Sequence, residues 1–425
     1  MRHQRDRCAM LAVALAVLAV PLRAQTPGPS SLTPDDAVRM AVENSPAVAA
    51  ARSRLEAAEA EVRGARAPYG LRAEIAPGAG FTGSNALLSH RLDIGGRRAA
   101  ATHLASAGRD VEQALLIVTR QQVAFEALTA YHDLARAQAD VRASEEAVAL
   151  ARQIRDAVRQ RVELGQAPAI QGTRADIEVA RAEQEAVRAR GQARGRQAAL
   201  NLLLGRGQDA GVAVADALPL PAPPAPPDDQ VRHALQQRPE LAASRARAEA
   251  RRGEAAVARA QGRPDLLAEV PADVWSLDRR DALHSRNLGF QLRVGLPLWR
   301  DGALRGEEQR AQAAVRAEEG ERMALERAIA REVEQAAAEL AAARDVALQY
   351  EQTILPRTRE LLAASRAGFE SGLTSYVDVL EAQRVTRLAQ MEYQDALFDA
   401  LRARLALDRA TGNIPGLPDE PAHRP

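Results

Sequence analysis

The sequence predicts a mainly α-helical fold with a smaller amount of β structure, and the same arrangement occurs twice along the chain. Alanine makes up 93 of the 425 residues and aromatic residues only 3%, a composition that favours long helices packed through small side chains. The mean hydropathy of −0.29 and the 27% of charged residues are too polar for a polytopic helical membrane protein. Arginine and acidic residues alternate to a net charge of +1, which argues against a nucleic-acid-binding protein.

The first 24 residues have the pattern of a secretory signal peptide. Three arginines precede an apolar run over residues 9–20, which is followed by Pro21 and by a small residue, Ala24. The run is shorter than the roughly 20 residues that a membrane-spanning helix needs, which disfavours a transmembrane anchor. Cleavage near Ala24 removes Cys8, so we expect a mature protein without disulfides, thiolate metal sites or a catalytic thiol.

Two self-alignments indicate that the chain is internally duplicated. At an offset of 193, residues 46–67 align with residues 239–260, and 11 of the 22 positions are identical. At an offset of 207, three glycines typical of helix ends align without a gap: Gly95 with Gly302, Gly165 with Gly372, and Gly205 with Gly412. The predicted parts are a signal peptide (1–24), a first repeat (25–211), a proline-rich linker (212–227), a second repeat (228–415) and a disordered tail (416–425).

Each repeat is predicted to contain a helix, a β-hairpin, a very long helix and a further helix. Thr33 suits the N-cap of the first helix, with Pro34 in its first turn. The predicted helices are residues 33–67, 97–164 and 168–204 in the first repeat and 228–263, 303–371 and 374–411 in the second. Each long helix would reach roughly 100 Å, and two shorter helices stacked end to end would match it. Leu348, Leu355 and Leu362 recur at heptad spacing, which fits such columns or a solvated coiled coil.

The segments between the helices alternate in polarity with a period of two, which is typical of β-strands with one apolar face. Over residues 288–298 every even position is apolar, for about eleven residues, which is the length of a strand that crosses a membrane. The expected lipid-facing side chains of this strand are Leu288, Phe290, Leu292, Val294 and Leu296. Trp275 and Trp299 fall at strand ends, where aromatic side chains meet a membrane interface.

Weaker alternation at residues 266–274, 71–81 and 86–94 completes two predicted hairpins, although His90 interrupts one apolar face. Two hairpins supply only four strands, which cannot close a barrel and would leave unpaired edges in lipid. Three copies would supply twelve strands and a ring of helical columns, so a trimer is the simplest closed assembly. An ordinary sheet in a soluble protein is the alternative.

Short motifs occur in a fixed order within this duplicated plan. They are Leu-Thr-Pro-Asp-Asp-Ala-Val at 32–38 with Asn-Ser-Pro at 44–46, Arg-Pro-Glu-Leu at 238–241, and Gly-Leu-Thr-Ser-Tyr-Val-Asp-Val-Leu at 372–380. Over nearly the whole mature chain, the sequence resembles the TolC-like family of outer-membrane efflux proteins. The resemblance implies a trimeric channel-tunnel, with an α-helical barrel across the periplasm and a shared transmembrane β-barrel in outer-membrane lipid.

The resemblance also implies partners: a periplasmic adaptor protein and an inner-membrane pump. Residues 92–98, Leu-Asp-Ile-Gly-Gly-Arg-Arg, look most like the cation-efflux branch, which works with resistance-nodulation-division pumps. The first hairpin, between Pro68 and Gly95, is short for the family, so its strands would barely span a membrane.

The breaks at Gly165 and Gly372 are the predicted periplasmic tips, because each long helix begins beside a hairpin and ends there. The resemblance implies that these turns face the adaptor and form the closed aperture. The predicted docking residues are Leu164, Gly165, Gln166, Gly372, Leu373 and Thr374. Glu370 and Asp378 are the candidate gate, although both also fit a solvated helix face. The first repeat has Gln171 in place of Asp378, so an acidic ring would come from the second repeat alone.

The sequence contains no pattern typical of an enzyme or of a resident metal. No two of the seven histidines are three or four residues apart, and neither a Gly-rich phosphate loop nor a Ser-His-Asp constellation is present. We therefore predict no catalytic activity, no cofactor and no metal site. The predicted function is a passive exit duct for metal cations or small toxic molecules. The alternatives are a type I secretion duct and an exported coiled-coil tether without a pore.

Overall fold

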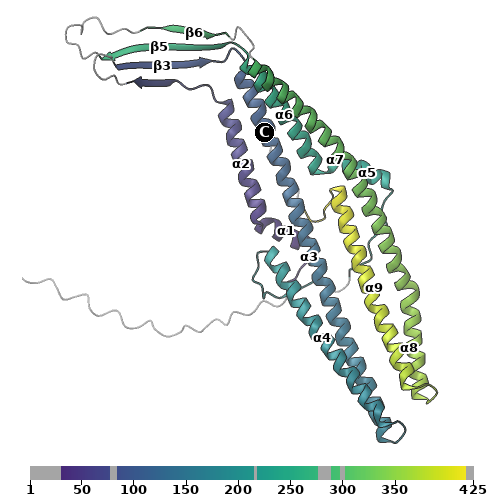
Figure 1. The fold of residues 1–425 in the computed structure, drawn as a ribbon. Coiled ribbons are helices and arrows are strands. Elements are labelled where there is room, and N and C mark those ends of the chain that lie inside the picture. The colour runs from purple at the N-terminus through teal and green to yellow at the C-terminus, as the bar shows by residue number, and fades with distance from the viewer. Residues whose placement is uncertain (1–29, 77–83, 215–217, 276–288, 297–301, 418–425) are drawn as a thin grey trace, which may run out of the picture.

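The computed structural model describes residues 30–76, 84–214, 218–275, 289–296 and 302–417. Figure 1 shows an elongated molecule with a small sheet at one end and two helical hairpins that extend away from it. The predicted signal peptide, Leu288, Trp299 and most of the predicted tail lie outside the described residues. No helix in the described part is both long and apolar enough to cross a membrane.

The first repeat follows the predicted order of elements. It contains β1 (Ser30–Ser31), α1 (Pro34–Asn44), α2 (Pro46–Arg66), β2 (Arg72–Ala76), β3 (Ser84–Leu92), α3 (Arg97–Glu163) and α4 (Ala169–Leu203). With 67 residues, α3 is about 100 Å long. Thr33 is the N-cap of α1, as predicted, because its side chain accepts a hydrogen bond from the Asp36 N–H at 3.1 Å.

The second repeat has the same order, but the helix predicted at the start of each repeat is in fact two helices. β4 (Val212–Ala213) lies in the predicted linker. The second repeat contains α5 (Pro227–Gln237), α6 (Pro239–Gln261), β5 (Asp265–Trp275), β6 (Gln291–Gly295), α7 (Gly302–Gln349), a π-turn η1 (Tyr350–Ile354), α8 (Leu355–Glu370) and α9 (Tyr376–Thr411). The backbone is extended at Ser45 and Arg238, with ψ of 122° and 123°. Both residues precede a proline, whose ring disfavours the helical conformation there.

The shorter helices stack end to end along the long ones, as predicted. In Figure 1, α2 and α4 follow one another along α3, and α6 and α9 do so along α7 and α8. A buried apolar cluster joins α1, α3, α4 and α9 through Ala37, Tyr131, Leu200 and Leu401. The Tyr131 hydroxyl donates a hydrogen bond to the Leu32 carbonyl at 3.1 Å, which satisfies the polar atom of this buried side chain.

The second long helix is not regular over its whole length, so the prediction of one uninterrupted helix over 303–371 is wrong. At η1 the Leu355 N–H bonds to the Tyr350 carbonyl, five residues back instead of four. Pro356 follows, and its ring has no N–H and clashes with a carbonyl four residues earlier in a regular helix. The equivalent residue of the first repeat is Ala149, and α3 is α-helical there. The proline therefore accounts for the difference between the repeats.

Four strands form an antiparallel sheet in the order β2-β3-β5-β6, and β1 pairs with β4 in a separate, parallel two-stranded sheet. β3 and β5 pair over nine residue pairs and join the two repeats. β5 extends the predicted strand 266–274 by one residue at each end, whereas the described β6 is shorter than the predicted strand 288–298. β2 and β6 are the two edges, and no described strand pairs with their outer sides.

The sheet has one apolar face and one largely polar face, as the alternation predicted. Leu88 pairs with Val270, and Leu292 with Ala268, on the apolar face. Four of the five predicted lipid-facing side chains are described, and all are exposed: Phe290, Leu292, Val294 and Leu296. On the polar face, Glu269 is only 2% exposed, because Arg293 and Gln291 bind its carboxylate at 2.9 and 2.7 Å.

A reciprocal arginine contact joins the two repeats next to the sheet, where α3 begins and α6 ends. The Arg97 guanidinium donates to the carbonyls of Ala260, Gln261 and Arg263 at 3.0–3.2 Å, at the C-terminal end of α6. In return, the Arg263 guanidinium donates to the Gly95 carbonyl at 2.9 Å. These bonds satisfy carbonyls that a helix end leaves free. Gly95 and Arg97 of the 92–98 motif therefore have a structural role.

We predict that His132 makes the stability of the fold fall in mild acid. Burial lowers the pKa of His132, and its Nδ1 atom has no hydrogen-bond partner. The unfolded chain therefore takes up a proton near pH 6.5 that the folded protein resists, so stability is present above that pH and is lost below it. The measurement is the thermal midpoint at pH 7.5 and pH 5.5. The drop should shrink in His132→Gln and persist in a control, His103→Gln, from the exposed surface of α3.

Candidate functional site

The two hairpin tips have the same backbone geometry, as the aligned glycines predicted. Gly165 and Gly372 have φ of +68° and +78°, a region that side chains with a Cβ rarely adopt. The Gly165 N–H bonds to the Val162 carbonyl at 3.0 Å, and the Gly372 N–H bonds to the Phe369 carbonyl at 3.1 Å. Each glycine therefore ends one helix and turns the chain into the next.

The second tip contains a capping box that the first tip lacks. The Asp378 N–H donates to Ser375 Oγ at 3.3 Å, and the Ser375 N–H donates to Asp378 Oδ2 at 2.8 Å. The hydrogen bonds from Ser375 lower the pKa of Asp378, so this carboxylate stays ionised. Asp378 thus has a structural role at the start of α9. Its role in a gate, with the exposed Glu370, stays a prediction.

Arg161 connects the two tips, and the sequence analysis did not find it. Its guanidinium donates to the Phe369 carbonyl at 2.7 Å and lies 4.3 Å from the centre of the Phe369 ring. Phe369 packs beside Tyr376, in a cluster with Ile154 and Val158 of α3. Burial, and then the nearby Glu178, raise the pKa of Tyr376 to about 12. The internal duplication gives one sign of a special role for Arg161. The 207 offset aligns it with Gly368, so the second repeat has no arginine at this position.

A groove of about 590 Å³ lies between α3 and α8 at the tips. Among the predicted docking and gate residues, it is lined by Leu164, Gln166, Glu370 and Gly372. Leu373 lies outside it and is 86% exposed, whereas Thr374 bonds to the Ser365 carbonyl. The structure therefore brings four of the eight predicted residues together on one surface.

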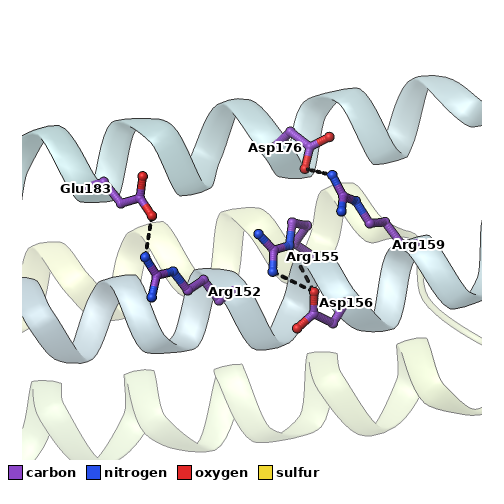
Figure 2. Close-up of polar contacts among 6 residues, drawn as sticks. All are labelled: Arg152, Arg155, Asp156, Arg159, Asp176 and Glu183. Carbon is purple, nitrogen blue, oxygen red and sulfur yellow. Dashed lines mark hydrogen bonds and ion pairs between the residues drawn. The ribbon is translucent and has the colours of Figure 1, made fainter.

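The first hairpin carries a regular series of ion pairs between α3 and α4 (Figure 2). Arg159 pairs with Asp176 at 2.8 Å, and Arg152 pairs with Glu183 at 2.6 Å. One heptad further from the tip, Arg190 of α4 pairs with Glu145 of α3 at 2.7 Å. We call these three pairs the ion-pair ladder. Each exposed pair contributes little alone, but the heptad spacing ties the two helices along one flank.

The second hairpin lacks this ladder. The 207 offset places Arg366 and Arg359 at the positions of Arg159 and Arg152, but glutamines replace both acids, at positions 383 and 390. Within the described residues, neither arginine makes an ion pair. The second hairpin is therefore held together by fewer charge contacts than the first.

The described residues contain no group of three or more histidine, cysteine or acidic side chains that could hold a metal ion. His90 and His132 each have a buried ring nitrogen without a hydrogen-bond partner. His90 lies in β3 and His132 in α3, so the two histidines belong to different elements.

Comparison with models of known protein families identifies the family to which this chain belongs. The model of the outer membrane efflux protein family matches residues 37–206 and 231–413, one stretch in each repeat. These stretches cover most of the chain, which therefore belongs to this family. It is an outer-membrane efflux channel component that extends into the periplasm. Membership favours the duct over the coiled-coil tether.

Individual relatives agree with this assignment. The cobalt-zinc-cadmium resistance protein CzcC of Cupriavidus metallidurans is 28% identical over 333 residues, which are 77% of each chain. The crystal structure of the outer membrane protein VceC of Vibrio cholerae matches with a TM-score of 0.73 and 22% identity, over 89% of this chain and 96% of that one. A crystal structure of CusC, described in terms of transmembrane channel formation, matches with a TM-score of 0.75 and 18% identity, over 89% and 92%.

We predict that Gly372→Ala loosens the second tip. An alanine at positive φ costs about 1 kcal/mol, which corresponds to a roughly fivefold increase in local opening. Amide hydrogen exchange at Leu373 and Thr374 should accelerate accordingly. The matched control is Gly172→Ala in the first turns of α4, where a Cβ meets no atom within 4 Å and should leave exchange unchanged or slower. Equal effects of both changes would contradict the argument from φ.

Proposed function

We propose that the chain forms a homotrimeric duct through the outer membrane and across the periplasm. The observation that carries this proposal is a two-faced sheet with two open edges at one end of helices about 100 Å long. Pairing of β6 in one copy with β2 in the next would use both edges and close twelve strands. The apolar face would contact lipid, and the polar face would line water.

The tips would be the periplasmic entrance. The groove between α3 and α8, with Leu164, Gln166 and Gly372 in its wall, offers both apolar and polar contacts to a periplasmic adaptor protein. An inner-membrane pump, of the resistance-nodulation-division type, would supply the energy. We assign no catalytic step, cofactor or resident metal to this chain. Its task would be to provide a sealed path and a gate.

The gate would be opened by a change in helix packing at the tips. Arg161 binds the Phe369 carbonyl, so the second hairpin is held to the first in this structure. Docking of the adaptor would replace such contacts and let the hairpins shear apart. Glu370 and Asp378, three copies of each, would then act on cations at the entrance by their charge.

Metal cations are the proposed cargo. Two observations support this assignment: the relative CzcC is named for cobalt, zinc and cadmium resistance, and the 92–98 motif resembles the cation-efflux branch.

We predict that the detergent-extracted protein has three times the mass of the mature chain, measured by light scattering with the detergent subtracted. Cysteines placed at positions 290 and 291 test the sheet, because Phe290 is on the apolar side and Gln291 on the polar side. A lipophilic probe should label Phe290→Cys strongly and Gln291→Cys weakly. A monomer or dimer, or equal labelling, would contradict the duct.

We predict that removing the charge of Glu370 and Asp378 lowers cation conductance of the reconstituted trimer. The double variant Glu370→Gln with Asp378→Asn keeps hydrogen-bond acceptors, so the capping box of α9 can persist. The reason is the loss of six negative charges at the entrance of the trimer. The matched control is Glu163→Gln, because Glu163 is the residue of the first repeat that aligns with Glu370. The predicted acidic ring comes from the second repeat alone, so this change should leave conductance at the wild-type level. Wild-type conductance in the double variant, with an intact tip, would exclude these residues as a gate.

A further inference from the structure

We propose that the duct has a belt of positive charge where the sheet meets the helices, and that this belt concentrates small anions and disfavours cations. The arginine belt consists of Arg72, Arg91 and Arg293, on the polar face of the sheet. The inference rests on the proposed function, because it takes this face as the wall of a water-filled duct. It adds an anion-binding role to that wall.

The belt residues lie in two neighbouring rows of the sheet. Arg72 of β2 pairs with Ser89 of β3 in one row. Arg91 of β3 and Arg293 of β6 lie in the next row, on either side of Leu267. The two rows are about 7 Å apart on the same face, because alternate residues of a strand share a face. Both rows are at the end of the sheet where α3 begins and α6 ends (Figure 1).

At this level the acidic side chains lie closer to the wall than the arginines do. The exposed fractions of arginine and acid are 63% and 2% for Arg293 with Glu269, 43% and 21% for Arg91 with Asp265, and 77% and 59% for Arg72 with Glu74. In every pair the guanidinium is the more exposed group. Each pair is therefore a dipole whose positive end faces the water.

The charges at this level do not cancel. Asp265 lies 3.3 Å from Arg91 and also 3.7 Å from Arg97, at the start of α3. Together with the other two pairs, four arginines thus contact three carboxylates, which leaves one positive charge per chain. Arginine stays charged at physiological pH, and its weakly hydrated guanidinium suits hydrogen bonding to anions.

Closure of the trimer would bring belt residues of different copies together. Arg72 lies on β2 and Arg293 on β6, the two edge strands of the sheet. Pairing of β6 with β2 of the next copy would place these two arginines on neighbouring strands, with both side chains on the polar face. Like charges on neighbouring strands repel each other, and an anion between them relieves the repulsion. Each of the three seams would therefore attract a small anion such as chloride.

The field of such a belt acts on the water inside the duct. A narrow space with walls of low dielectric constant focuses the field of the charges that line it. Rings of arginine favour anions in pores, whereas rings of acidic residues favour cations. The belt does not choose the cargo or drive export, which is the task of the pump. It lowers the concentration of cations in the barrel, so fewer cations diffuse back from outside.

The test measures the electrostatic potential at the belt with an engineered cysteine. Ser89→Cys is nearly isosteric and lies in the row of Arg72, and Gln291→Cys, exposed in the same row, is a second reporter. Cys8, the one cysteine of the sequence, lies in the predicted signal peptide. The purified full-length trimer is treated at low salt with anionic sulfonatoethyl methanethiosulfonate or with the cationic trimethylammonioethyl reagent. Each rate is divided by the rate for a small free thiol.

The normalised ratio of the anionic to the cationic rate reports the potential, because the reactivity of the thiol itself cancels. A potential of about +1 kT/e raises the local concentration of anions about 2.7-fold and lowers that of cations equally. We therefore expect a ratio of about seven or more at both reporter positions. The ratio should fall towards one in about 1 M salt, where the Debye length is only about 3 Å.

Removal of belt charges should lower the ratio. In the Ser89→Cys protein, we expect Arg72→Gln and Arg91→Gln each to lower it about threefold, because each removes three charges from the trimer. Both changes leave the buried Glu269 paired with Arg293, so the sheet should keep its structure. A light-scattering mass that stays trimeric confirms that the barrel is intact.

Two controls separate the belt from a general effect of charge. Arg72→Lys keeps the charge and should keep the ratio. Arg52→Gln makes the same charge change on the exposed surface of α2 and should leave the ratio at the wild-type level. A ratio of one at both reporters, or an unchanged ratio in Arg72→Gln and Arg91→Gln, overturns the inference. If no trimer forms, or neither charged reagent reaches either cysteine, the proposed function fails instead.

Discussion

The rest of the structure depends on the packing of other helices against α3. This helix runs without a break over 67 residues and contacts α1, α2, α4, α6 and α9, so it belongs to the core of both repeats (Figure 1). Seven of its fifteen buried residues are alanine, for example Ala107, Ala124 and Ala137. Small side chains let helix axes come close over a long distance, and they cost little side-chain entropy on burial. A composition with few aromatic residues is sufficient because many short contacts replace a few large ones.

The duplication explains the shared path of the chain, and the differences between repeats explain how the two hairpins differ. Three kinds of substitution at equivalent positions act in the same direction. Arg161 faces the other hairpin where the second repeat has Gly368, the acids of the ladder are replaced by glutamine, and Ala149 is replaced by Pro356. Each change removes a polar tie or a helix bond from the second hairpin. The two hairpins can therefore share a fold and still differ in rigidity, since the second has fewer polar contacts and an irregular helix.

Much of this fold could be predicted, because short sequence features, such as glycines at helix ends, mark where each element begins and ends. The glycines at 165 and 372 end helices in the expected turns, and α3 ends within one residue of the prediction. The missed features depend on less direct signals. The helix breaks at Ser45 and Arg238 arise because each residue precedes a proline, which disfavours the helical conformation there. The helical pattern of apolar residues continues across both positions, so the breaks were not predicted. Arg161 was missed because its partner is the Phe369 carbonyl, a backbone atom that no side-chain pattern marks. The pairing of β3 with β5 joins segments about 180 residues apart.

In the proposed duct, the polar face of the sheet would offer few strong binding sites to a cation. Its described acidic side chains are Glu74, Asp265 and Glu269, and each lies within 4 Å of an arginine, at 3.8, 3.3 and 2.9 Å. A carboxylate that is already paired offers a passing cation little net attraction, because the cation must displace the guanidinium. Conduction requires sites that release an ion as easily as they accept it. A wall of paired charges provides water and hydrogen bonds without a strong site, so selection would fall to the tips and to the pump.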